Sequence, residues 1–383
     1  MENTSFLSNF LKQNHNTITQ PLYLYDIQRI EDNCNKMKNC INYADTSFHY
    51  ATMANSNVDF LKIIKKQSFN VFVNSLNHLK LSKKCGFKPQ QIIFTASSLD
   101  EQTIDYLHDN KILLHLDSIN QLDYWAKKYP GTPVGIRCNP VSNGKEAKKT
   151  RGGYFLGKQS RLGLTFEEII NLKHKELICS LHIYVGTDIL DVDYFFKHYK
   201  KLADLAVYFP NLRYLDFGGG FGVDEYQEKC FDFDKYGEGV DNLMKEISLI
   251  YGQPLKLILE PGRIIGSNAG YYITKIIDTK DRFDKQVVVL NSSIVQFPRP
   301  LFYGEKTKHP VYVFDKDGNI KTTGNHTCML VGCSTYSRDI FIDNLNIGKL
   351  TAGDFVVFGN SGAYCSSSYT QFLGFNKPKE IFI

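Results

Sequence analysis

The chain has 383 residues, of which 43% are hydrophobic and 22% charged, and its formal net charge at pH 7 is +5. This length suits one large domain with a smaller one, and the composition is typical of a globular protein. The modest charge, without long runs of one sign, argues against a nucleic-acid or membrane surface. No apolar run is long enough to span a bilayer.

The targeting and redox signals favour a cytoplasmic protein. The nine cysteines are scattered without a CxxC motif or a paired framework, which suits a reducing compartment and predicts no bound metal. The N-terminus, MENTSFL, has no basic region followed by an apolar stretch. We therefore expect no signal peptide and a cytoplasmic location.

Short β-rich apolar runs alternate with helical segments, such as Asp100–His108 and Val192–Tyr208, through the middle of the chain. The candidate strands are Ser47–Ala51, Val71–Val73, Gln91–Phe94, Ile112–Leu116, Pro133–Arg137, Ile178–Tyr184, Tyr214–Phe217 and Lys256–Leu259. Eight strands separated by helices over roughly 220 residues predict a TIM-like (β/α)₈ barrel. A doubly wound open sheet is the alternative, for which eight such strands would be less usual.

After Gly270 the predicted strands follow one another without intervening helices. They are Gln286–Leu290, Val311–Phe314, Cys328–Val331 and Phe355–Phe358. This pattern predicts an α/β protein that ends in an antiparallel β domain.

The N-terminal run Pro21–Tyr25 has no helix-paired partner nearby, so we expect this strand to join the C-terminal sheet. The predicted organisation is therefore an N-terminal segment, residues 1–40, that contributes to the β domain. A barrel over 41–270 and a β domain over 271–383 follow it.

Three segments at the predicted strand ends carry candidate chemistry. Functional residues of such barrels lie just after the C-terminal ends of the strands. Met53 follows the first strand, Asp216–Gly222 (DFGGGFG) closes the seventh, and Glu260–Arg263 (EPGR) closes the eighth. The glycines can let backbone N–H groups approach an anion, although a tight turn with packing glycines is the alternative.

Glu260 and Arg263 offer complementary groups. A carboxylate can keep a pyridine nitrogen protonated, and a guanidinium offers planar charged donors to a phosphate. An ion pair of purely structural role is the alternative.

The hexapeptide Tyr50–Asn55 (YATMAN) resembles the Tyr-Ala-x-Lys-Ala-Asn signature of the fold-type III pyridoxal-phosphate (PLP) decarboxylases of the ornithine/diaminopimelate type. Arg137–Pro140 resembles the Arg-x-Asn-Pro of this family, and Ser160–Gly163 its Ser-Lys-Phe-Gly. Phe94-Thr95 and Asp117-Ser118 match the ends of its third and fourth strands. The resemblance covers residues 20 to 375 approximately, and the order of the motifs makes it specific.

The resemblance implies a PLP cofactor, an amino-acid substrate and a role for each matching position. The residues that would hold the phosphate are Gly218, Gly219, Gly220, Arg263, Thr187 and Tyr364. Glu260 would hold the pyridine nitrogen, and the residues that would contact the substrate are Arg137, Tyr336, Arg338, Asp339 and Phe372. It also implies a head-to-tail homodimer in which residues 332–339 complete the partner's active site.

Two departures from the family concern the cofactor. Met53 stands where the family has the Schiff-base Lys, and a thioether has no nucleophilic nitrogen. Tyr184 stands where a His stacks on the ring, which keeps the aromatic face but loses the imidazole. His182 shares the face of Tyr184 by strand alternation, and we expect it in the core or in a supporting role.

Two further departures lie in Gly332–Asp339, which resembles Gly-Pro-x-Cys-(Asp/Glu)-x-x-Asp. Thr335, a far weaker acid, replaces the Cys that would return a proton, and Cys333 is the second choice for that role. Tyr336 replaces the acidic residue that binds a distal amine, and Arg338 lies two residues further on. An Arg338 that is only a surface residue without a role in binding is an equal alternative. The change favours a substrate with an anionic distal group.

Three interpretations of function stay open. The first is a decarboxylase of an amino acid whose distal nitrogen is acylated or carries carboxylates, such as a citryl-ornithine-like siderophore intermediate, inactivated because its Lys was replaced by design. The second is a natural non-catalytic homologue that binds a ligand or partner. The third is a diaminopimelate, ornithine or lysine decarboxylase. An alanine-racemase relative would not explain Glu260.

Overall fold

The computed structural model describes residues 2–141, 149–224, 229–303, 309–321 and 324–383. These residues form two compact units. One unit contains Ile30–Asp224 and Lys229–Ile265, and the other contains the N-terminal residues up to Arg29 together with Gly266–Ile383. The domains expected at 1–40, 41–270 and 271–383 are a prediction about which parts of the chain fold as domains, and that prediction stays open.

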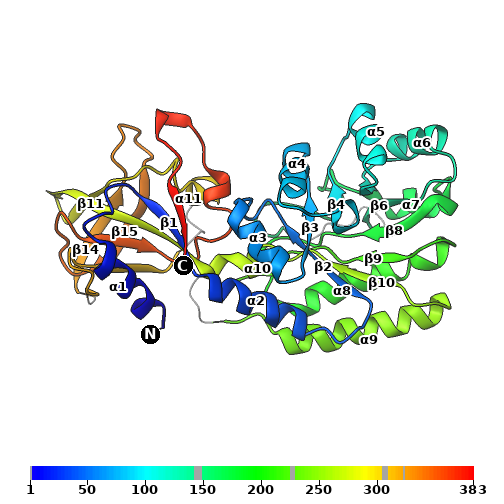
Figure 1. Cartoon of the computed structure of the whole chain (residues 1–383), viewed down its shortest axis with the longest axis horizontal. Helices are drawn as coiled ribbons and strands as arrows, with labels where there is room; N and C mark the ends of the chain where they lie inside the picture. The colour runs from blue at the N-terminus through cyan, green and yellow to red at the C-terminus, as the bar shows by residue number, and fades with distance from the viewer. Residues whose placement is uncertain (1, 142–148, 225–228, 304–308, 322–323) are drawn as a thin grey trace. The chain divides into compact units, whose positions relative to one another are not determined.

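In the described part of the first unit, eight parallel strands close into a barrel surrounded by helices (Figure 1). They are β2 (Thr46–Ala51), β3 (Asn70–Val73), β4 (Ile92–Thr95), β5 (Leu113–Leu116), β6 (Val134–Asn139), β8 (Ile178–His182), β9 (Tyr214–Asp216) and β10 (Lys256–Leu259). The pairing of β10 with β2 closes the ring, so the open-sheet alternative is wrong and the predicted barrel is confirmed. A two-residue strand, β7 (Leu164–Thr165), adds to β6.

Helices connect these strands. They are α2 (Ile27–Asn39), which precedes β2, and then α3 (Val58–Lys66), α4 (Leu76–Lys84), α5 (Glu101–Asp109), α6 (Ile119–Lys128), α7 (Phe166–Ile170), α8 (Val192–Ala203), α9 (Phe233–Tyr251) and α10 (Arg263–Gly266). Short 3₁₀ turns lie at η1 (Pro89–Gln91), η2 (Lys175–Leu177) and η3 (Ala206–Tyr208). Among the described helices, none has the length and apolar run that crossing a bilayer would require.

Local sequence explains where these helices begin and end. Asp232 precedes α9, and its side chain accepts a hydrogen bond from the N–H of Lys235, which satisfies one of the unpaired donors at a helix start. Thr165 and Glu168 form a reciprocal capping box at α7. Gly252 ends α9 with a φ of 85°, a left-handed conformation that glycine adopts without a steric cost.

The second unit is built on strands that pair mostly antiparallel (Figure 1). They are β1 (Leu22–Tyr25), β11 (Gly270–Arg282), β12 (Lys285–Leu290), β13 (Val311–Phe314), β14 (His326–Val331), β15 (Ile340–Ile347), β16 (Phe355–Phe358) and β17 (Lys379–Phe382). The pairs β12–β14 and β1–β17 are parallel. Strand β1 pairs with β11, which confirms that the N-terminal strand joins the C-terminal sheet.

Four elements of this unit were not predicted from the sequence: β11, β15, β17 and the N-terminal helix α1 (Glu2–Asn14). Leu7, Phe10 and Leu11 of α1 pack in the core of this unit beside Leu24 of β1. The Ser8 hydroxyl donates to the carbonyl of Gly318 at 2.7 Å. The helix is therefore part of the β unit. Short helical segments η4 (Ser267–Ala269), α11 (Arg299–Tyr303), η6 (Ser366–Ser368) and η7 (Phe372–Gly374) complete it.

Candidate active site

Most of the cofactor residues predicted from sequence meet at one end of the barrel. They are Met53 after β2, Tyr184 and Thr187 after β8, Gly218, Gly219 and Gly220 after β9, and Glu260 and Arg263 after β10. Arg137 lies within β6. Because the strands are parallel, their carboxyl ends share one mouth, where such barrels place their chemistry.

The backbone around Met53 is fixed by its neighbours. The N–H of Ala51 donates to the carbonyl of Pro261 at 3.1 Å, and the N–H of Thr52 donates to the carbonyl of Phe72 at 3.1 Å. The N–H of Ala54 closes a turn on Ala51 at 3.0 Å. Met53, which is half-buried, therefore projects from a turn held between β3 and the segment after β10.

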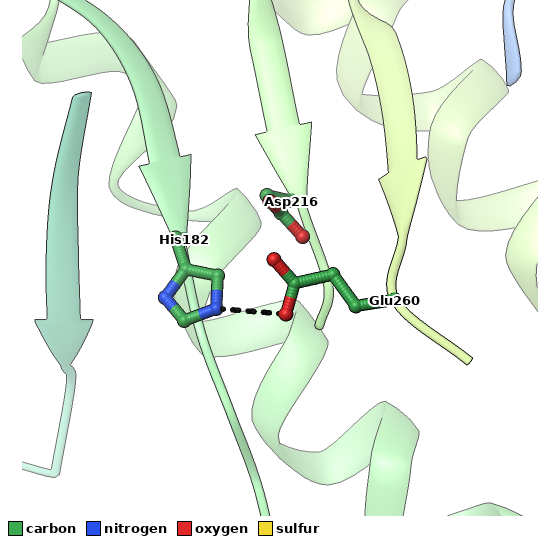
Figure 2. Close-up of side chains that lie close together, drawn as sticks. All are labelled: His182, Asp216 and Glu260. Atoms are coloured by element: carbon green, nitrogen blue, oxygen red, sulfur yellow. Dashed lines mark ion pairs between the residues drawn. The ribbon is translucent and has the colours of Figure 1, made fainter. Parts of the chain in front are cut away.

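His182, Asp216 and Glu260 form a buried cluster at the ends of β8, β9 and β10 (Figure 2). One ligand atom of each lies within 4.8 Å of the others, and His182 Nε2 is 3.5 Å from Glu260 Oε2. The N–H of Gly218 donates to Asp216 Oδ1 at 2.9 Å. The exposed fractions are 1%, 0% and 3%, so these groups are removed from bulk water.

Burial governs the protonation of this cluster. It raises the pKa of Glu260 above its ordinary value, against the opposing effects of the neighbouring Asp216 carboxyl and the positive charge of Arg137. Burial, with the negative charge of Glu260, raises the pKa of Asp216 well above its ordinary value. Burial and Arg137 lower the pKa of His182, so its imidazole is neutral at pH 7.

The glycines after β9 are required by close packing of the main chain. A Cβ on Gly218, whose φ is +64°, would lie 2.3 Å from the carbonyl oxygen of Ile183, and one on Gly219 would lie 2.2 Å from that of Glu260. A Cβ on Gly220 would meet the carbonyl oxygen of Gly186 at 2.2 Å. The packing interpretation therefore holds for these residues.

The same loop still offers anion donors. In the described part of the chain, the N–H groups of Gly219 and Gly220 have no hydrogen-bond acceptor. Unpaired backbone N–H groups of successive residues favour anions. The packing and anion-binding interpretations are thus compatible.

A chain of charges lies beside this loop. Arg263 Nε is 3.4 Å from Asp188 Oδ1, and Arg151 Nη1 is 2.6 Å from Asp188 Oδ2. Asp188 also accepts the N–H of Val223 at 3.1 Å. Asp188 and Arg151 were not predicted from the sequence as site residues. Asp188 directly follows Thr187 in a loop expected to bind phosphate, and this position was a usable signal.

Tyr184 and Thr187 contact each other. The two hydroxyl oxygens are 2.8 Å apart, and the ring of Phe155 packs edge-on to Tyr184 with centroids 4.8 Å apart. Burial raises the pKa of the Tyr184 phenol, so it is neutral and able to donate a hydrogen bond.

Arg137 faces Asp117, which joins three of the sequence motifs. Arg137 Nε is 4.0 Å from Asp117 Oδ1, and that oxygen accepts the N–H of Gly163 at 2.9 Å. Ser97 donates to Asp117 Oδ2 at 3.0 Å. The Arg-x-Asn-Pro, Asp-Ser and Ser-Arg-Leu-Gly segments therefore lie together around one carboxylate.

A second buried histidine supports the cluster and was not anticipated. The two ring nitrogens of His115 lie 2.8 Å from the hydroxyls of Thr95 and Ser180, and its ring stacks on His182 with centroids 5.0 Å apart. This arrangement fixes the plane of His182. The buried position of His182 beside Glu260 fits the expectation that His182 lies in the core or supports the site.

The remaining predicted residues belong to the β unit. Asp339 is buried; its Oδ1 accepts the N–H of Ile294 at 2.6 Å and its Oδ2 the N–H of Ser334 at 3.1 Å. Asp339 therefore shapes the loop that carries Cys333, Thr335 and Arg338, all of which are exposed. Burial and Asp339 raise the pKa of the Cys333 thiol.

Three aromatic residues among the predicted site residues also belong to the β unit: Tyr336 within this loop, and Tyr364 and Phe372 nearer the C-terminus. Tyr336 packs edge-on to Phe372, with centroids 5.7 Å apart. Tyr364 has a φ of 57°, an uncommon conformation for a non-glycine residue that accompanies functional or tightly constrained positions.

The barrel residues fit a pyridoxal phosphate group chemically. Among the described residues, Glu260 Oε1 is buried without a donor, so this carboxyl group has acceptor capacity to spare for a ring N–H. The N–H groups of Gly219 and Gly220, with Arg263 nearby in the next loop, suit a phosphate.

The comparisons with known proteins agree with this fit. The family described as "Pyridoxal-dependent decarboxylase, pyridoxal binding domain" matches residues 27–267. Diaminopimelate decarboxylase from Buchnera aphidicola subsp. Schizaphis graminum is 29% identical over 371 residues, covering 92% of this chain and 86% of the relative. The enzyme of Helicobacter pylori strain J99 is 26% identical over 378 residues, covering 95% and 89%.

Solved structures show the same architecture. Diaminopimelate decarboxylase from Helicobacter pylori complexed with L-lysine is similar with a TM-score of 0.83 and 25% identity, over 97% of this chain and 93% of that one. The lysine/ornithine decarboxylase of Vibrio vulnificus complexed with putrescine shares the fold, with a TM-score of 0.80, 18% identity and 98% coverage of both chains. The family match spans more than half of the sequence, and on that ground the chain belongs to the pyridoxal-dependent decarboxylases.

Proposed function

We propose that this chain binds PLP without a covalent link and retains the site of a diaminopimelate-type decarboxylase, with Met53 in place of the lysine that turnover requires. One observation carries the proposal. Glu260, Gly219 and Gly220, which would contact the cofactor, follow strands that end at the barrel mouth. Position 53, which follows Ala51 and Thr52 with their hydrogen bonds to the carbonyls of Pro261 and Phe72, carries a thioether.

The roles of the barrel residues follow from their chemistry. Glu260 would accept the pyridine N–H, and Arg263 with Thr187 and the free glycine N–H groups would bind the phosphate. Tyr184 would cover one ring face. Bound PLP supplies an electron sink for the bond to the departing carboxylate.

Residues of the β unit would complete the site, as the family resemblance implies. Tyr364 would contribute to the phosphate site and Phe372 to the substrate site. Thr335 or Cys333 would return the proton after carbon dioxide departs. These assignments rest on motif order, and they include a homodimer whose partner supplies the loop over 332–339.

The substrate we favour carries a distal carboxylate. The relatives described above are diaminopimelate decarboxylases, and diaminopimelate has an amino-acid group at each end. Arg338 is exposed on the loop shaped by Asp339 and supplies a cation there, and Tyr336 lacks the negative charge that would attract a plain amine. The citryl-ornithine-like substrate has no counterpart among these relatives, so we do not retain it as the main proposal.

Restoring an amine at position 53 tests the proposal. The Met53→Lys variant, supplied with PLP, should release carbon dioxide from meso-diaminopimelate at least about 100-fold faster than the unaltered chain, since covalent catalysis is otherwise absent. Ornithine and lysine should be poorer substrates. Met329→Lys is the matched control, because Met329 is also half-buried but lies on β14 in the β unit.

The outcomes separate the candidate functions. A Met53→Lys protein that binds PLP and decarboxylates ornithine or lysine preferentially would overturn the substrate assignment. A variant that binds no PLP would favour the non-catalytic homologue, which the departures at Met53, Tyr184 and Thr335 already make the second candidate.

A further inference from the structure

Asp216 is a buried carboxyl group for which the proposed reaction has no role. It ends β9 inside the barrel, fully buried, and Figure 2 shows its carboxyl group pointing toward that of Glu260. Asp216 Oδ1 accepts the Gly218 N–H. Within the described residues, Asp216 Oδ2 and Glu260 Oε1 have no donor.

Two ionised carboxylates in this position would be unstable. They would place two like charges together in a site removed from water, each with an unsatisfied oxygen. One proton between them removes one charge and supplies the missing hydrogen bond. The pair then titrates as a unit, with one proton retained to unusually high pH.

The surrounding groups supply little compensation for a second negative charge. His182 on β8 is neutral at pH 7, and His115 stacks behind it. Arg137 on β6 acts on Glu260 but also faces Asp117. Burial raises the pKa of the Tyr199 phenol on α8, and the charges of Asp216 and Glu260 raise it further, so it stays neutral; its hydroxyl lies 3.2 Å from that of Tyr236.

We propose that Asp216 is a positioning residue that stays protonated at neutral pH and donates a hydrogen bond to the Glu260 carboxylate. The raised pKa values of Asp216 and Glu260 then belong to the pair, which retains one proton. Asp216 holds that proton, and Glu260 carries the single negative charge, matched to one protonated ring nitrogen. This inference rests on the role proposed for Glu260 and adds to it the group that orients and ionises that carboxylate.

The protonation of the cofactor-free protein can be measured directly. With a chelator present to exclude metal ions, the unaltered chain at about pH 7 should show the infrared carbonyl stretch of a buried carboxylic acid, which Asp216→Asn should abolish. Asp241→Asn is the control, because Asp241 is a buried carboxylate of the same unit that accepts the N–H groups of Asn42 and Tyr43. An unaltered chain without this band would overturn the proposal.

The pH dependence of stability gives a second measurement. The pKa of Asp216 is raised above its unfolded value, so its stabilising contribution is complete below about pH 4 and is lost as pH rises toward the folded pKa. The urea midpoint of the unaltered chain should therefore fall relative to that of Asp216→Asn over this range. A constant difference, or the opposite slope, would contradict a protonated Asp216.

Ligand binding then tests the hydrogen bond itself. The probe is pyridoxine 5′-phosphate, which has no aldehyde and so cannot react with surface lysines. Asp216→Asn keeps a neutral donor and should retain its affinity, whereas Asp216→Ala should lose about tenfold, as expected for one buried hydrogen bond. If Asn and Ala weaken binding equally, Asp216 acts through its charge and the proposal is wrong. If the unaltered chain does not bind the probe, the proposed function fails while the infrared and urea results still decide the protonation.

Discussion

Met53 and the glycines after β9 occupy backbone positions that their neighbours determine. The turn around Met53 is held by the carbonyls of Phe72 and Pro261, so the Met53→Lys change alters the chemistry of the side chain without moving its anchor. Gly218 and Gly219 lie against the carbonyls of Ile183 and Glu260. Residues at this mouth are therefore fixed by contacts from the neighbouring strands.

Gly219→Ala should test this dependence. Its Cβ would lie 2.2 Å from the Glu260 carbonyl oxygen, so the chain must shift and stability should fall by about 2 kcal/mol or more. Affinity for pyridoxine 5′-phosphate should fall with it, because Glu260 moves. Gly252→Ala is the control: it strains a left-handed residue in open space and should cost about 1 kcal/mol without affecting binding. Equal losses in both variants would refute the packing argument.

The sequence indicated the candidate site residues themselves better than it indicated which of them contact one another. Glu260 and Arg263 were recognised because they stand in a motif. Asp216 was recognisable because it ends a predicted apolar strand directly before a run of glycines. Its partner Glu260 lies 44 positions away in the sequence, and only the closure of the barrel brings the two side chains together. The partners of Asp188, Arg151 and Arg263, are likewise distant in the sequence.

At the level of elements, the barrel strands were predictable because each is a short apolar run between amphipathic helices. The long strand β11 was not, because its second half is polar and exposed and lacks the alternation that indicates a half-buried strand. Helix α1 was missed because its apolar residues gain their significance only from the sheet they cover.

We expect α1 to contribute directly to the stability of the β unit. Leu11 is fully buried in the cluster that also contains Leu24 and Ile273, so Leu11→Ala should lower the free energy of unfolding by about 3 kcal/mol. The neighbouring exposed Gln13 is the control, and Gln13→Ala should change stability by less than about 0.5 kcal/mol. Chemical denaturation of both variants measures this. A Leu11→Ala protein as stable as Gln13→Ala would show that α1 is dispensable.

At the scale of the whole molecule, the proposed homodimer makes a prediction that uses Met53 itself. Suppose that residues 332–339 act in the partner's site. A chain with an inactive barrel site and an intact loop can then complete the site of a chain that has an active barrel site and a defective loop. The unaltered Met53 chain is the first kind, and the Met53→Lys/Arg338→Glu double variant is the second. Arg338 is exposed, so the charge reversal should leave the fold intact.

Mixed dimers of these two chains should decarboxylate diaminopimelate although neither chain does so efficiently alone. Random assembly at equal amounts makes half of the dimers mixed, each with one complete site, so the activity per chain should be about a quarter of that of Met53→Lys. Co-expression with two different affinity tags isolates the mixed dimers, whose activity per chain should be about half. Activity no higher than that of the double variant would mean that each chain uses its own loop, or that no shared site forms.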